Sequence, residues 1–218
     1  MQQVKIRRAD SEDSGFIVEA IIAAEKSGSA LLSYAGIFGM EESAVAGLLT
    51  RALEEDIEGQ EVCLSNFLIA EVQGTPAAAC ASWVEGQAGV SSGQIKANLL
   101  FHLLGEAAWS TAADRLKAVA ETAIERSIGA VQLESIYTKP DFRRLGLTPS
   151  LVEEHLRMHR ERDPEIKRAQ LILFKNNARA AHVYQKMGFV QTAERNGKSS
   201  LLSSILSCPA KIMMEKQF

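Results

Sequence analysis

The spacing of apolar and polar residues predicts a chain of mixed strands and helices. Residues 4–9 alternate with the period of a short strand, and 12–26 follow the period of an amphipathic helix with Asp10 and Ser11 available as caps. A second helix is predicted over 41–59, after a glycine-rich connection. The runs NFLIAEV and PAAACASWV, separated by QGT, indicate two strands joined by a tight turn.

The second half of the chain predicts helices and strands in alternation. Helical stretches over 95–104 and 107–127 precede a strand from Ala130 to Thr138, and a turn then leads into a helix over 149–162. The strand QLILF, the short helix ARAAHVYQKM and the strands GFVQTAE and AKIMMEK complete the pattern. Because no repeat or linker divides the chain, we predict one α/β domain over 1–218 with a helical insertion at about 91–127.

The composition is that of an ordinary globular protein. Of its 218 residues, 46% are hydrophobic and 23% are charged, and the net charge of −3 gives no basic footprint, so we expect no nucleic-acid partner. Cys63, Cys80 and Cys208 lie far apart without a CxxC pair, which favours a reducing compartment. The first residues do not resemble a secretory signal, and no apolar run reaches the roughly 18 residues of a membrane span. We therefore expect a cytoplasmic protein without a membrane partner.

The turn RRLGLT, residues 143–148, joins a predicted strand to a predicted helix. A pyrophosphate needs converging backbone N–H groups, close approach of the backbone and positive charge, and a helix N-terminus supplies the first and the last. Gly146 permits a left-handed backbone, and Pro149 suits the first residue of a helix. Arg143 and Arg144 add positive charge. The same features also suit an ordinary connection, so the turn by itself leaves both interpretations open.

A second pattern lies in NNARAAHVYQKMGF, residues 176–189. Asn177 can cap a helix there, and Gly188 can end it in the left-handed conformation. At helical spacing, one face carries an amide, two small side chains and a phenol. That face suits a thin, amide-bearing ligand lying alongside it. Its residues are Asn177, Ala180, Ala181, Tyr184 and Gly188.

Together the two patterns resemble those of the GNAT superfamily of acyl-CoA-dependent N-acetyltransferases. The family's acyl-CoA loop, Q/R-x-x-G-x-G/A, would be residues 143–148, and its signature N-x-x-A-x-x-x-Y-x-x-x-G-F is matched in full by 177–189. Thr148 departs from the usual Gly or Ala, and Pro149 removes one N–H group. The resemblance implies an α/β fold with a mixed, mostly antiparallel sheet flanked by helices, in which two strands splay apart around the acyl-CoA site.

The resemblance also implies a reaction and the residues that carry it. The reaction is transfer of an acetyl group from acetyl-CoA, as co-substrate, to a primary amine of a small molecule or peptide. Tyr184 would be the general acid, and Glu134, which alternates with Ile136 along its strand, would be the base. Structural roles for both side chains, and a water chain in place of the base, remain open. The residues expected to bind acyl-CoA are Ile136, Thr138, Arg143, Arg144, Leu145, Gly146, Leu147, Thr148, Asn177, Ala180 and Tyr184.

Other functions remain open at this stage. His155 and His159 stand four residues apart, but Leu156 occupies the place of the zincin glutamate and no third ligand is evident, so we expect no metal site. A regulatory or sensor module that binds acyl-CoA with weak catalysis would keep both motifs. A structural protein that uses 91–127 as an interface would need neither, and a homodimer is also open. The sequence does not determine the acceptor amine or the acyl chain length.

Overall fold

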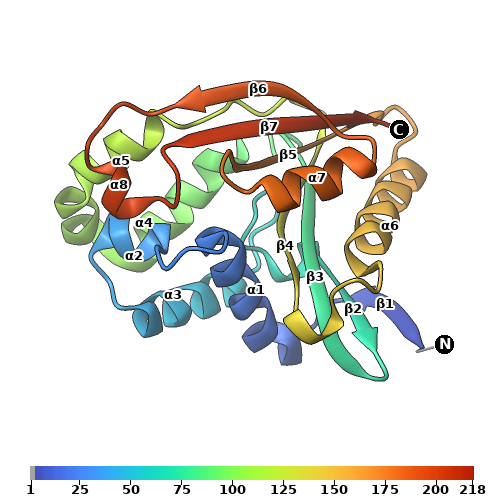
Figure 1. Ribbon diagram of the computed structural model, residues 1–218. Coiled ribbons are helices and arrows are strands. Elements are labelled where there is room, and N and C mark those ends of the chain that lie inside the picture. The colour runs from blue at the N-terminus through green and yellow to red at the C-terminus, as the bar shows by residue number, and fades with distance from the viewer. Residues whose placement is uncertain (1–2) are drawn as a thin grey trace.

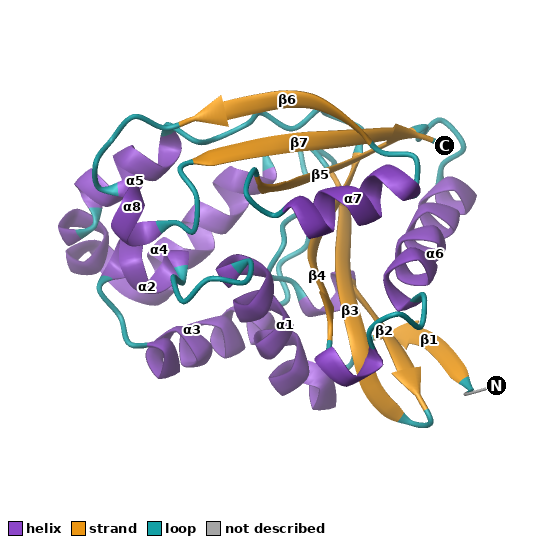
Figure 2. Ribbon diagram, viewed as in Figure 1, coloured by secondary structure: helices purple, strands orange, loops and turns teal. Residues whose placement is uncertain are grey.

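The computed structural model describes residues 3–218. They form one seven-stranded sheet with helices packed against it (Figures 1 and 2). Neighbouring strands are antiparallel except β4 and β5, which run parallel. The predicted mixed, mostly antiparallel sheet is therefore confirmed. In the order β1-β2-β3-β4-β5-β7-β6, the strands are β1 (Val4–Arg8), β2 (Phe67–Val72), β3 (Thr75–Val84), β4 (Val131–Thr138), β5 (Arg168–Phe174), β7 (Ala210–Gln217) and β6 (Val190–Asn196).

Helices cover both faces of the sheet. Two helices, α6 (Leu147–Arg162) and α7 (Ala178–Lys186), pack on one face, while α1 (Ser14–Lys26), α3 (Glu42–Glu55) and α4 (Ser92–Thr111) pack on the other. Among the described residues, no helix is both long and apolar enough to cross a membrane. The remaining helical elements are α2 (Ser33–Phe38), α5 (Ala113–Ala120), α8 (Leu202–Ile205) and the 3-10 turns η1 (Ser11–Asp13), η2 (Leu64–Asn66) and η3 (Pro140–Phe142).

The alternation of strand side chains explains why both faces are apolar. Along β2, Leu68 and Ala70 pack toward α6, whereas Phe67 and Ile69 pack toward α1 and α3. The turn that joins β2 to β3 is tight, as predicted, because Gln73 and Gly74 both adopt positive φ angles of 52° and 79°. The central strands are thus fixed between two helical layers.

The structure differs from the predicted helices in two places. Residues 33–38, predicted as a connection, form α2, which buries Tyr34 and ends at Gly39 in the left-handed conformation. The helix predicted over 107–127 begins within α4, which is bent at Gly105, and α5 ends at Ala120. The chain then crosses to β4 without regular structure, and this crossing carries Arg126 to the sheet.

The strands β4 and β5 are paired only near their starts. Val131 lies opposite Ala169 and Gln132 opposite Gln170, and the Gln132 amide donates to Gln170 Oε1 at 3.0 Å. Beyond these pairs, β4 stays bonded to β3 and β5 stays bonded to β7. The two strands therefore part toward their carboxyl ends, which confirms the predicted splay.

Candidate active site

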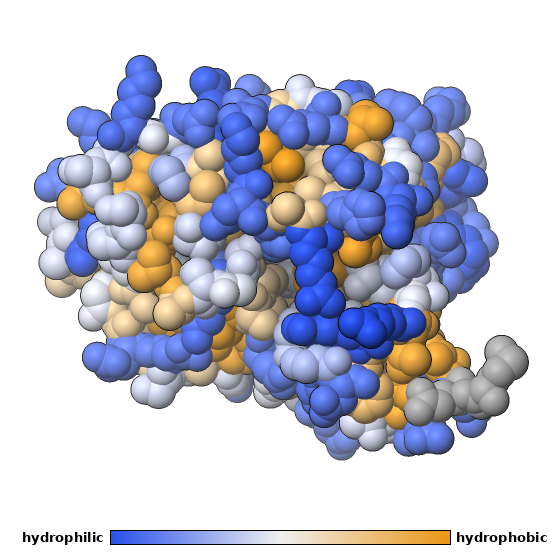
Figure 3. Space-filling view, in the orientation of Figure 1, coloured by the Kyte–Doolittle hydropathy of each residue, from blue (hydrophilic) through white to orange (hydrophobic). Residues whose placement is uncertain are grey.

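The parting of β4 and β5 opens a cavity of about 810 Å³. Residues 133–138 of β4 and 171–174 of β5 line it, together with the start of α6, one side of α7, the end of α1 and the segment that follows α5. The volume lies within the usual range of small-molecule sites. Figure 3 shows hydrophilic side chains crossing this face of the molecule between α7 and the β4–α6 connection.

The β4–α6 connection ends in a turn with two left-handed residues. Arg144 has a φ of 69° and Gly146 one of 75°, and α6 begins directly afterwards at Leu147. Pro149 is thus the third residue of the helix, not the first as predicted. The Ser150 N–H group bonds to the Gly146 carbonyl at 3.2 Å, while those of residues 147 and 148 bond to no described residue. The start of α6 therefore keeps free N–H groups at the cavity wall despite the proline.

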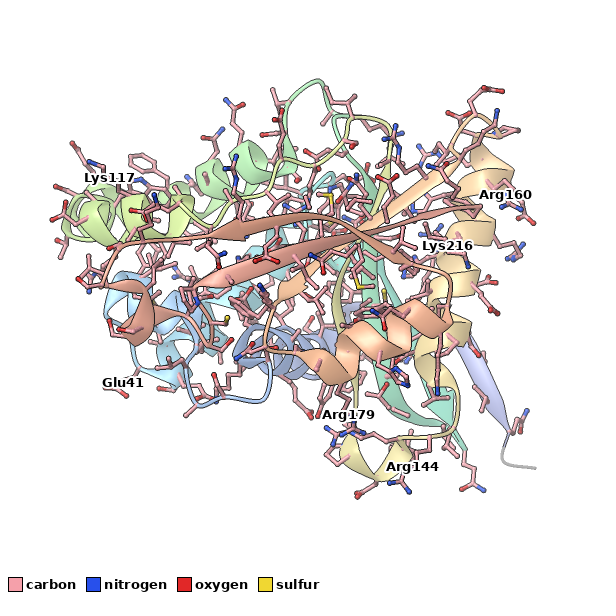
Figure 4. The ribbon with its side chains drawn as sticks, turned by 45° about the horizontal axis from the view of Figure 1, so that its top comes forward. Glu41, Lys117, Arg144, Arg160, Arg179 and Lys216 are labelled. Atoms are coloured by element: carbon pink, nitrogen blue, oxygen red, sulfur yellow. The ribbon has the colours of Figure 1, made fainter. Side chains whose placement is uncertain are left out.

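Side chains of this turn tie it to the sheet and make it basic. The hydroxyls of Thr148 and Thr138 share a hydrogen bond of 3.2 Å, which joins the first turn of α6 to the end of β4. Arg143, Arg144 and Arg179 line the cavity, with Arg179 on α7 and Arg144 on the turn before α6 (Figure 4). This arrangement concentrates positive charge at one part of the cavity.

The helix α7 is fixed in the way its sequence predicts. Asn177 caps it by accepting a hydrogen bond from the Ala180 N–H group at 3.1 Å, and its amide donates to the Ser27 hydroxyl at 2.8 Å. Gly188 follows the helix with a φ of 88°. Asn177 therefore anchors α7 to the end of α1, and both Asn177 and Ala180 line the cavity.

Tyr184 projects from α7 into the same cavity. Its ring packs edge-to-face on Phe189 with the centroids 6.2 Å apart, and its hydroxyl bonds to no residue within 3–218. Burial raises the pKa of this phenol far above its ordinary value, so the hydroxyl stays protonated at neutral pH. Tyr184 is thus a buried proton donor without an internal acceptor.

Glu134 lies at a bulge in β4. Ser135 adopts a φ of 51°, and the register with β3 shifts at this point. As a result, Leu133 and Ile136 both contact the α6 side of the sheet, whereas Tyr137 contacts the α1 side. The predicted simple alternation of Glu134 with Ile136 is therefore wrong, because the extra residue reverses it.

The carboxyl of Glu134 pairs with a residue that the sequence analysis did not single out. Its Oε1 atom accepts from Arg126 Nη2 at 2.5 Å. Burial raises the pKa of Glu134 to about 7, with a further rise from Glu61, although Arg126 and Lys96 lower it. A carboxyl that titrates near neutral pH can both accept and release a proton under ordinary conditions.

Further charged residues line the cavity near Glu134. Lys96 Nζ lies 2.5 Å from Glu61 Oε1, and Arg126 Nη2 lies 3.9 Å from Glu61 Oε2. Lys211 of β7 lines the same cavity. Sequence reasoning missed these residues because they come from distant segments, although the alternation in AKIMMEK could have indicated that Lys211 faces away from Ile212 and Met214.

Of the residues predicted to bind acyl-CoA, only Leu145 stands outside the cavity lining, with 45% of its surface exposed. The others line it from β4, the turn, the start of α6 and α7. Leu147 also packs into the core with 2% exposure. The fold thus brings together Glu134, the turn at 143–148 and the motif at 177–189 around one cavity.

His155 and His159 lie outside the cavity, on the side of α6 that faces β3. His155 Nε2 lies 2.8 Å from the Cys80 carbonyl, which can only accept, so Nδ1 accepts from Ser82 Oγ at 2.6 Å. Ser82 Oγ in turn accepts from His159 Nε2 at 2.8 Å. Burial lowers the pKa of both histidines to about 4. Within the described part of the chain, no group of three or more His, Cys, Asp or Glu side chains is arranged to hold a metal.

Comparisons with known proteins agree with this architecture. The family model described as acetyltransferase (GNAT) family matches residues 40–189. An N-acetyltransferase from Staphylococcus aureus Mu50 is 16% identical, with 97% of this chain and 100% of that chain covered and a TM-score of 0.61. An agmatine N-acetyltransferase mutant is 14% identical, with 99% of each chain covered and a TM-score of 0.57.

A third structure, the ribosomal-protein-S18-alanine N-acetyltransferase from Escherichia coli, is 14% identical, with 99% of this chain and 94% of that chain covered and a TM-score of 0.50. No curated protein sequence matches the chain closely enough to add to these comparisons. The fold is therefore that of an acetyltransferase. Because the family model spans more than half of the residues, the chain belongs to the GNAT acetyltransferase family.

Proposed function

We propose that this protein transfers an acetyl group from acetyl-CoA to a primary amine of a small molecule or peptide. One observation carries the proposal: a single cavity contains a basic turn with free N–H groups, a buried tyrosine and a half-buried carboxyl whose pKa is about 7. Acetyl-CoA is the co-substrate of the GNAT family, to which the chain belongs. The cavity offers a place for each part of that reaction.

The turn and the parted strands would hold acetyl-CoA. The N–H groups of Leu147 and Thr148, with Arg143 and Arg144 beside them, supply donors and positive charge for a pyrophosphate. The edge of β4 that faces β5 lacks a strand partner beyond Gln132. Backbone groups at 136 and 138 can therefore bond to the amides of the pantetheine arm, with Asn177 and Ala180 along its other side.

The proton transfers can be assigned to two side chains. Glu134, about half ionised at neutral pH, accepts a proton from the acceptor ammonium directly or through a water. The amine nitrogen then bonds to the thioester carbon, the C–S bond breaks, and its electron pair passes to sulfur. Tyr184, held neutral by burial, donates its proton to the developing thiolate.

Thermal unfolding with and without acetyl-CoA tests the binding part of this proposal, with ATP and NAD as controls. At about a hundred times its dissociation constant, a ligand of the native state adds roughly 2.7 kcal/mol, which raises the midpoint by about 5–10 °C for a chain of this size. Absence of a rise with saturating acetyl-CoA would overturn the proposal.

Turnover with an amine panel tests the chemistry. Tyr184→Phe and Glu134→Gln should each keep the acetyl-CoA-dependent rise in midpoint and lose about a hundredfold or more in turnover. Glu153→Gln, a change at an exposed position of α6, is the matched control and should leave both unchanged. A rise in midpoint without turnover on any amine would instead identify an acyl-CoA-binding module with weak catalysis.

A further inference from the structure

The cavity has a charged region on the sheet face opposite α6 and α7. In β7, Ile212 and Met214 pack toward α6 and α7, so Lys211 points to the other face. In β4, Leu133 packs toward α6, so Glu134 also points to the other face. Six charged side chains from different segments line this part of the cavity: Glu25, Glu61, Lys96, Arg126, Glu134 and Lys211.

The carboxylates of this charged region already have partners. Glu61 pairs with Lys96 at 2.5 Å, and Glu134 pairs with Arg126 at 2.5 Å. Glu25 accepts a hydrogen bond from a serine hydroxyl. An acceptor with a second ammonium group would therefore find two of the three carboxylates neutralised by protein cations.

Lys211 is the cation of this region without a counterion. No carboxylate within residues 3–218 lies at ion-pair distance from its ammonium group, and the ring centroid of Phe174 lies 5.2 Å from its Nζ atom. Burial lowers the pKa of Lys211, although the surrounding glutamates partly offset this from a distance. Lys211 is partly exposed on the cavity wall, so its ammonium group can pair with an anionic group of a ligand that enters the cavity.

Building on the proposed acetyl transfer, we propose that the acceptor is an amine that also carries a carboxylate, as a free amino acid does, and that this carboxylate pairs with Lys211 in the charged region. The amine of the same molecule then lies toward Glu134, which accepts its proton. Lys211 selects the acceptor by charge, and Tyr184 acts from the opposite face of the sheet on the leaving sulfur.

Matched acceptors that differ only in the carboxylate test this inference: L-lysine against cadaverine, L-ornithine against putrescine, and L-alanine against ethylamine. Thiol release from acetyl-CoA gives kcat/KM for each. In the unmodified protein, the carboxylate-bearing member of at least one pair should be preferred by about tenfold or more, the usual effect of a charged hydrogen bond. Lys211→Met should remove that preference, because kcat/KM should fall much more for the carboxylate-bearing member than for the plain amine.

The control is Lys167→Met, which removes an exposed lysine that is 64% accessible and should alter neither member of a pair. Lys211→Gln serves as a second variant, and both Lys211 variants should unfold near the midpoint of the unmodified protein because Lys211 is partly exposed and makes no salt bridge within residues 3–218. A preference for the diamines, or an equal loss on both members of each pair in Lys211→Met, would overturn the inference while the proposed acetyl transfer stands.

Thermal shifts with each acceptor in the presence of CoA provide a readout that does not need turnover. The carboxylate-bearing member should raise the midpoint of the unmodified protein and not that of Lys211→Met. If acetyl-CoA binds but no amine is acetylated, the proposed function fails, and these shifts still decide whether Lys211 binds a carboxylate. Equal shifts in both proteins would reject that role.

Discussion

Replacing Arg126 by methionine tests whether its half-buried ion pair with Glu134 sets the working pH of that carboxyl. In the structure, Arg126 Nη2 lies 2.5 Å from Glu134 Oε1 and lowers the pKa of that carboxyl, which burial alone would place higher than about 7. An opposite charge at such a distance lowers a carboxyl pKa by about 1–3 pH units. Arg126→Met should therefore move the pKa of Glu134 from about 7 to roughly 8–10.

The sign of the effect on activity follows from the role of Glu134 as a base. Only the ionised carboxylate accepts a proton, so kcat/KM rises as pH increases through the pKa of Glu134 in the free enzyme. At pH 7 the ionised fraction should fall from about one half to about one tenth or less, and activity should recover as the pH is raised. The assay is the pH profile of kcat/KM between about pH 5.5 and 10, a range that spans both pKa values.

Two variants control for general damage. Arg126→Lys keeps a positive charge and should displace the midpoint of the profile less than Arg126→Met. Arg157→Met removes an exposed arginine that pairs with Glu154 and Glu161 on α6, away from the cavity, and its profile should match that of the unmodified protein. An unchanged midpoint near pH 7 in Arg126→Met, or an equal loss at every pH, would refute the reasoning.

Two further predictions concern stability. Gly146→Ala adds a side chain where φ is 75° but nothing lies within 4 Å, so only backbone strain is added; the free energy of unfolding should fall by about 1–2 kcal/mol in denaturant titrations, and an unchanged value would contradict the left-handed turn. Leu151→Ala removes a fully buried side chain between α6 and the sheet and should cost about 2–5 kcal/mol, measured in the same way; a loss under 1 kcal/mol would mean that α6 packs differently.

Local patterns in the sequence were sufficient to predict the sheet, the turn and α7. The cap at Asn177 and the left-handed Gly188 depend on neighbours within one or two helical turns, so their spacing along the chain carries the information. The same holds for Gly146 before α6. The turn at 143–148 and the helix α7, which carries Tyr184, could therefore be located from the sequence alone.

The charged region could not be predicted, because its geometry depends on contacts between distant segments. Arg126 reaches Glu134 because α5 ends at Ala120 and an irregular segment leads to β4, and residues 121–128 contain no glycine or proline that would mark this helix end. The bulge at Ser135 was hidden for a similar reason, since serine gives no signal for a positive φ. The position of Lys211 required the strand order.

The separation of β4 from β5 also affects where another chain could add a strand to the sheet. Two strand edges without neighbours are a template on which other chains can add strands. Here both edges lie inside the molecule, with the end of α1, the start of α6 and α7 around them, and not at the rim of the sheet. The protein can thus keep two open edges for a ligand without exposing them to aggregation.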